Sequence, residues 1–205
     1  MPPQSPNSIV VQEARSKDLV PVLNGTALHS LHNPQREAEV FASNHLSHLS
    51  RSPYALILGL GFGYHIEEVA KVLRLRHKEA HIAVVEPSSE LVRLHSAYAP
   101  APQSPYHVFR CDDARELFLN DEFCRFLLKK PVVLVHQPSF DAHAAYYRNL
   151  LGRRAAAAPS AWRLGDTKLE AELAELAAPD LPGTLHTPGE CGHVLRAFWE
   201  MKHAD

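Results

Sequence analysis

Three closely spaced glycines mark the first place where this sequence could bind a ligand. Gly59, Gly61 and Gly63 follow the apolar run Tyr54 to Leu58 and lead into a segment whose apolar residues repeat with helical spacing. Glycines between a strand and a helix allow backbone N–H groups to approach a ligand closely at the helix N-terminus. We therefore take this loop as the candidate ligand site, with a simple tight turn as the alternative.

The spacing of the glycines bears on the type of ligand. Dinucleotide-binding loops have the pattern G-x-G-x-x-G, whose third glycine would fall on Tyr64. The sequence has G-x-G-x-G instead. This spacing disfavours a nicotinamide or flavin cofactor.

Acidic side chains follow the next two predicted strands. Glu86 ends the buried run His81 to Glu86, and Asp112 and Asp113 follow the run Tyr106 to Cys111. The carboxyl ends of neighbouring parallel strands meet over one crevice, so we expect Glu86 beside the glycine loop. There its carboxylate could accept hydrogen bonds from both hydroxyls of a ribose. The alternatives are a solvated acid at Glu86 and a helix cap at either aspartate.

A histidine ends the fourth predicted strand, Pro131 to His136, and precedes Gln137-Pro138-Ser139-Phe140. A histidine in this position can act as a general base near neutral pH. His136 is therefore the candidate catalytic residue. Because the chain has 14 histidines, a purely structural role is the alternative.

One group of potential metal ligands lies near the C-terminus. His186, Cys191 and His193 are of the types that bind zinc, but no C-x-x-C pair or fourth nearby ligand accompanies them. We predict no metal site. Cys111, Cys124 and Cys191 are odd in number and widely spaced, which favours reduced thiols over a disulfide framework.

Four strands separated by helical segments predict an α/β fold. Right-handed crossovers favour a parallel sheet in the order 3-2-1-4, within a Rossmann-like three-layer α/β/α sandwich. Asn24-Gly25 predicts a small β-hairpin before this domain, between strands at Leu19–Leu23 and Thr26–Leu31. Asn33-Pro34 then predicts the start of a helix reaching about Ser47.

Composition describes an ordinary globular protein of 205 residues, 45% hydrophobic, with a formal net charge of −2. This balance gives no sign of nucleic-acid binding. No apolar run reaches the roughly 20 residues that span a bilayer, and the N-terminus is unlike a signal peptide, so we expect no membrane partner and a cytoplasmic location. The expected divisions are a flexible tail at 1–17, the hairpin and helix at 18–50, and the Rossmann-like domain at 51–205. In the last third we expect helices over 168–178 and 192–203 and one short strand over 184–187.

The glycine loop, Glu86 and the segment Asp112-Asp113-Ala114-Arg115 resemble motifs of the class I S-adenosylmethionine (SAM) dependent methyltransferases, with spermidine-synthase-like features. The resemblance implies that SAM is the cofactor. It places Gly59, Gly61 and Gly63 at the methionine and ribose, Glu86 on the ribose, and Asp112 with Asp113 near the adenine. The sequence departs from the pattern at Ile57, where the first motif usually has an acid. It also lacks the leading Asn or Asp and the second proline of the N/D-P-P-Y/F motif at His136-Gln137-Pro138.

Residues 28–151 also resemble the N-terminal domain of the motility accessory factor family of flagellin glycosyltransferases, a Rossmann-like module ahead of the sugar-transferring domain. Glycosyl transfer by this chain is not implied. The matching segments are Leu28-His29-Ser30, Asn33 to Ala38, Gly59 to His65, Val85-Glu86-Pro87, Val135 to Pro138, and Tyr146-Tyr147.

Two functional hypotheses follow. The first is a SAM-binding, methyltransferase-like protein that transfers a methyl group to an acceptor that the sequence does not specify. The second is a non-catalytic nucleotide-binding or interaction module that has kept the fold. The sequence leaves the oligomeric state open.

Overall fold

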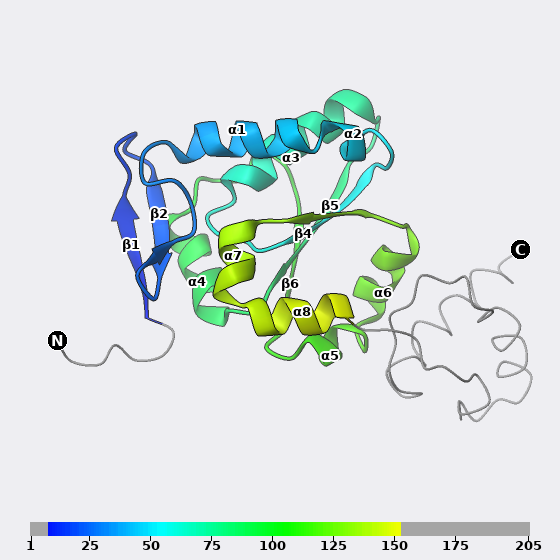
Figure 1. Cartoon of the computed structure of the whole chain (residues 1–205). Coiled ribbons are helices and arrows are strands. Elements are labelled where there is room, and N and C mark those ends of the chain that lie inside the picture. Colours follow the sequence, from blue (N-terminus) through cyan, green and yellow to red (C-terminus); the bar gives the residue numbers. More distant parts are fainter. Residues whose placement is uncertain (1–7, 153–205) are drawn as a thin grey trace, which may run out of the picture. The chain divides into compact units, whose positions relative to one another are not determined.

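The computed structural model describes residues 8–152 (Figure 1). Within this range the chain forms two compact units. The first comprises residues 8–112 and 130–144, and the second comprises residues 113–129 and 145–152. The predicted helices and strand of the last third, with His186, Cys191 and His193, lie outside the described residues.

The first unit contains a parallel sheet of four strands. They are β4 (Tyr54–Leu58), β5 (His81–Glu86), β6 (His107–Arg110) and β7 (Val132–Val135). Their order is β6-β5-β4-β7, which confirms the predicted order 3-2-1-4 and the Rossmann-like α/β class. Leu58 of β4 pairs with Val85 of β5 and with Val135 of β7. The glycine loop, Glu86 and His136 therefore all lie at the carboxyl end of the sheet.

Helices alternate with these strands, and side chains cap several of them. Asn33 accepts a hydrogen bond from the Arg36 N–H at the start of α1, and Ser88 accepts one from the Leu91 N–H at the start of α4. In the first unit the helices are α1 (Pro34–Asn44), α2 (Leu46–Leu49), α3 (Tyr64–Arg76), α4 (Ser89–Tyr98) and α7 (Gln137–Ala142). The others are α5 (Ala114–Leu117), α6 (Asp121–Leu128) and α8 (Ala144–Gly152).

The helix predicted to run from Asn33-Pro34 to about Ser47 is shorter than expected. It ends at Asn44, and α2 starts two residues later. Between them His45 leaves helical geometry, and its ring Nδ1 lies 2.8 Å from the carbonyl oxygen of Phe41. A side chain that bonds the preceding turn in this way competes with the backbone, which explains the break.

One continuous core lies between the sheet and the helices α1, α2 and α3. The sheet contributes Ile57, Val84 and Leu134, and α3 contributes Val69 and Leu73, all at most 1% exposed. Figure 1 shows α1 and α3 running side by side. This packing fixes both helices relative to the edge of the sheet where the glycine loop lies.

A second, antiparallel sheet consists of β1 (Ile9–Glu13), β2 (Leu19–Leu23) and β3 (Thr26–Ala27). Asn24 and Gly25 have φ values of 50° and 83°, as a type I′ hairpin requires, so the predicted turn is confirmed. The predicted second strand is shorter, since β3 ends at Ala27. The Leu28 N–H still donates to the Pro21 carbonyl, but Pro21 has no N–H that could return a bond to Leu28.

The flexible tail predicted over 1–17 is wrong where β1 forms. Ile9 to Glu13 pair with β2, and Ile9 and Val11 pack against a buried cluster that includes Leu23 and Phe62. The β-branched residues of this stretch gain their stability from a partner strand that local sequence does not reveal.

The described residues include no helix long and apolar enough to cross a bilayer. Cys111 and Cys124 are buried and are not joined in a disulfide within residues 8–152.

Candidate functional site

The glycine loop adopts a left-handed backbone at all three glycines. The φ values of Gly59, Gly61 and Gly63 are 105°, 50° and 81°. Between them Leu60 and Phe62 are at most 1% exposed. The loop thus turns the chain from β4 into α3 while placing two apolar side chains in the interior. Glycine is needed here for backbone geometry, whether or not a ligand binds.

Glu86 lies beside the glycine loop, and its carboxylate accepts hydrogen bonds from two backbone N–H groups of the protein. Its Oε2 accepts a hydrogen bond from the Leu60 N–H (3.0 Å), and its Oε1 accepts one from the Ser88 N–H (2.9 Å). The residue is fully buried. Burial raises the pKa of the Glu86 carboxyl to about 7, although the two N–H donors favour its charged form.

His29 occupies the other side of the same loop. Its Nε2 accepts a hydrogen bond from the Phe62 N–H (2.9 Å), so the neutral ring carries its proton on Nδ1. Nδ1 lies 3.8 Å from Oε2 of Glu37 on α1. Burial, and next the neighbouring His65, hold the pKa of His29 well below its ordinary value. A Cβ on Gly61 would overlap the His29 ring.

His29, His65 and His136 form a buried cluster at the edge of the sheet. The rings of His65 and His136 stack with centroids 4.0 Å apart and planes at 8°. The His29 ring lies 4.8 Å from that of His136 and 5.5 Å from that of His65. Three chain segments that are distant in sequence, the loop after β3, the start of α3 and the end of β7, bring these rings together.

Hydrogen bonds fix the orientation of two of these rings. Nε2 of His65 donates to the Gly59 carbonyl (3.0 Å), which leaves its Nδ1 as a buried acceptor without a partner. Nδ1 of His136 shares a hydrogen bond with Oγ of Ser139 (2.7 Å). Burial lowers the pKa of His65 to about 4 and that of His136 well below its ordinary value. Both rings are therefore neutral at physiological pH.

A pocket of about 240 Å³ opens beside this cluster. Its walls combine the histidine rings with apolar side chains of α1 and of the segment around β7. The residues that line it include His29, Glu37, Phe41, His45, His65 and His136. An apolar pocket with a few convergent polar groups is the usual form of a small-ligand site.

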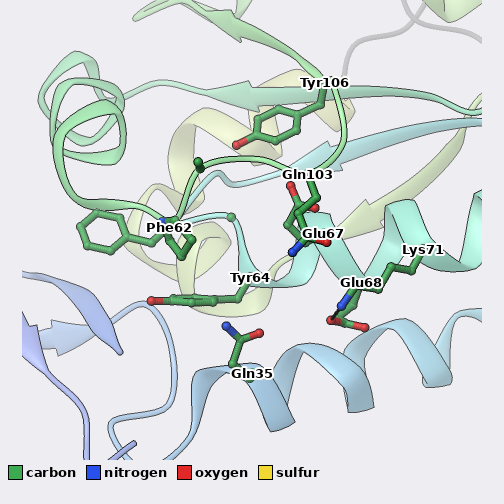
Figure 2. A pocket seen from close by; sticks show the side chains of 11 residues that line it. Gln35, Phe62, Tyr64, Glu67, Glu68, Lys71, Gln103 and Tyr106 are labelled. Atoms are coloured by element: carbon green, nitrogen blue, oxygen red, sulfur yellow. Dashed lines mark hydrogen bonds and ion pairs between the residues drawn. The ribbon is translucent and has the colours of Figure 1, made fainter. Parts of the chain in front are cut away.

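A smaller pocket of about 70 Å³ lies beside Phe62, Gly63 and Tyr64. Figure 2 shows it between Gln35 of α1, Glu67, Glu68 and Lys71 of α3, and Tyr106 just before β6. Burial raises the pKa of the Glu67 carboxyl, although backbone N–H groups of Ser104 and Gln103 act in the opposite direction. Gly63 lines this pocket, whereas Gly59, Gly61, Glu86 and Asp112 line neither of the two.

The two aspartates predicted near an adenine are not part of either pocket. Asp112 follows β6, its side chain is 73% exposed, and it pairs with Arg110 at 3.4 Å. Asp113 begins the second unit, and its backbone carbonyl accepts a hydrogen bond from the Glu116 N–H.

Sequence reasoning identified His136 but not His29 or His65 as candidates. A partial signal was available, since His65 lies two residues after Gly63 and His136 ends the fourth apolar run, whereas His29 has no comparable local signal. What was missing was the fold that joins them.

Comparison with protein-family models finds no match, and neither does comparison with curated protein sequences. Solved structures of similar fold include MnmC2 from Aquifex aeolicus, at 13% identity and a TM-score of 0.38, with 57% of this chain and 46% of that chain covered. Another is spermidine synthase from Thermotoga maritima, at 13% identity and a TM-score of 0.46, with 70% and 61% covered. The chain thus spans less than two thirds of either protein, and the similarity concerns the fold alone.

Gly61→Ala should destabilise the ligand-free protein more than Gly25→Ala does. Both glycines have positive φ, but an alanine at Gly25 meets nothing within 4 Å, while one at Gly61 displaces His29. We expect about 1 kcal/mol at Gly25 from backbone strain. At Gly61 we expect about 2 to 4 kcal/mol, because the Phe62 N–H also loses its partner. Urea unfolding measures both, and equal losses would contradict the structural role of His29.

Glu86 should make the stability depend on pH between about 4.5 and 7. Its pKa is raised in the folded state, so its stabilising effect is complete below about 4.5 and is lost as pH rises through about 7. The stability of wild type relative to Glu86→Gln should therefore fall by up to about 3 kcal/mol over this window. Urea unfolding between pH 4.5 and 8 tests this, with Glu39→Gln as the control for an exposed carboxylate. A difference independent of pH would be the contrary result.

Proposed function

We propose that this chain is a non-catalytic binding module with a Rossmann-like, methyltransferase-like fold. In this proposal the glycine loop has a structural role. Ligands bind in the pocket of about 240 Å³ beside His29, His65 and His136, which we call the histidine pocket. The supporting observation is that the groups expected to hold a cofactor are satisfied within the chain.

The part of the expected cofactor site between Gly59 and Phe62 has partners within the chain. The Leu60 N–H is bonded to Glu86, and the Phe62 N–H is bonded to His29. The space next to Gly61 is filled by His29, and that next to Gly59 by Ser139. A nucleoside lying on this loop would have to break buried hydrogen bonds and leave their donors or acceptors unpaired, which is unfavourable.

SAM binding with methyl transfer is the second candidate, and the position of Glu86 favours it. The carboxyl lies beside the glycine loop at the end of β5, where a ribose acceptor is expected. In this case Gly59, Gly61 and Gly63 would bind the methionine and ribose, Glu86 the ribose, and Asp112 with Asp113 the adenine. Methyl transfer requires mainly that cofactor and acceptor be aligned. The neutral ring of His136 would take a proton from the acceptor.

Thermal unfolding in the presence of SAM, S-adenosylhomocysteine, ATP or NAD separates the two candidates. A ligand that binds the native state stabilises it by about 2.7 kcal/mol at 100 times its Kd. We expect none of the four to raise the melting temperature. An increase with SAM that is lost in Glu86→Ala and kept in Glu39→Ala would contradict the proposal and establish SAM binding, the first requirement of the second candidate.

A further inference from the structure

The three buried histidines have the arrangement of a metal-binding site. One ring nitrogen of each lies within 4.8 Å of one ring nitrogen of each of the others. Nitrogens bound to one tetrahedral Zn²⁺ at about 2.0 to 2.1 Å are about 3.3 Å apart, so the rings must rotate to bind one ion, and the stacked rings of His65 and His136 must leave their parallel arrangement. The adjoining pocket gives the rings room for such rotations.

One ring nitrogen of each histidine lies next to a polar group that could support it. Histidines that bind metals usually direct the second ring nitrogen to a carbonyl, a carboxylate or another polar group. Here His65 donates to the Gly59 carbonyl, Nδ1 of His136 bonds Ser139, and Nδ1 of His29 faces Glu37 at 3.8 Å. The remaining nitrogens, Nδ1 of His65 and Nε2 of His136 and His29, are the candidate coordinating atoms, although Nε2 of His29 already accepts the Phe62 N–H.

Nδ1 of His65 is the most direct indication that a ligand is needed. The residue is 2% exposed, and this nitrogen has no hydrogen-bond partner. A buried polar atom without a partner destabilises the protein unless a bound species engages it. Because the ring is neutral and its proton is on Nε2, Nδ1 can accept only a hydrogen-bond donor or a cation.

We propose that His29, His65 and His136 bind a divalent transition-metal ion that prefers imidazole, with Zn²⁺ as the first candidate. The pocket leaves the fourth position to water or to a small ligand of the module. The proposal does not depend on whether SAM binds. The prediction of no metal site rested on the C-terminal residues His186, Cys191 and His193. The cluster of His29, His65 and His136 forms only when the chain is folded.

Metal binding changes one contact of the glycine loop. Nε2 of His29 accepts the Phe62 N–H, and the same lone pair is needed for the metal. The ion must therefore displace this one hydrogen bond, and its coordination by three imidazoles has to outweigh the loss, so the Phe62 amide reports on binding. Neutral imidazoles are the form that coordinates metals, and burial keeps all three rings neutral.

The test uses the full chain without an affinity tag, freed of metal with a chelator. Titration with Zn²⁺ in a calorimeter should show one ion bound per chain. His65→Gln keeps a donor for the Gly59 carbonyl, and His136→Asn keeps a group for Ser139, but each removes the coordinating nitrogen. Each should weaken Zn²⁺ binding at least about tenfold, the scale of losing even a supporting contact. His32→Gln, at an exposed histidine, should bind like wild type.

Nuclear magnetic resonance of the histidine ring nitrogens gives a readout that needs no variant. Zn²⁺ should shift the resonances of Nδ1 of His65 and Nε2 of His136, together with the Phe62 amide, and leave His32 unchanged. The proposal is overturned if wild type binds no stoichiometric ion, if folded His65→Gln and His136→Asn bind like wild type, or if only exposed histidines shift.

Discussion

Two hydrogen bonds to buried side chains fix the glycine loop at the carboxyl end of the parallel sheet. The Leu60 N–H donates to Glu86 and the Phe62 N–H donates to His29. Each joins the loop to a separate part of the chain, one to the end of β5 and the other to the segment after β3. A left-handed loop cannot pair its N–H groups as a helix or strand does, so these side chains supply the partners that burial demands.

The same requirement explains why ionisable groups are buried here. Glu86 and His29 are charged most readily in water, yet the interior holds both because each completes a backbone hydrogen bond. Burial then raises the pKa of Glu86 and lowers that of His29, which in both cases favours the neutral form. The ring of His29 in turn lies against that of His136, and the ring of His65 stacks on the same His136 ring. The histidine pocket is thus a consequence of how the loop is closed.

Local sequence patterns were sufficient for the sheet and the hairpin turn. The apolar runs that end at Leu58 and Glu86, and the pair Asn24-Gly25, each specify their structure within a few residues. Contacts between distant segments were not predictable in this way. His29 and Phe62 are 33 positions apart. Their contact depends on β3 ending at Ala27, and β1 likewise depends on a partner strand. The expected ribose acceptor, Glu86, was placed correctly beside the loop, but its internal partners follow from its depth in the fold.

The exchange of the Leu60 and Phe62 amide protons with solvent tests most directly whether the loop is closed by its own chain. In ligand-free, chelator-treated protein both amides should exchange as slowly as the Gly59 amide, which is bonded to Val85 within the sheet edge. Adding SAM should leave their rates unchanged. Rapid exchange of both amides without ligand, with protection that develops only when SAM is added, would contradict this account and identify the loop as an open cofactor site.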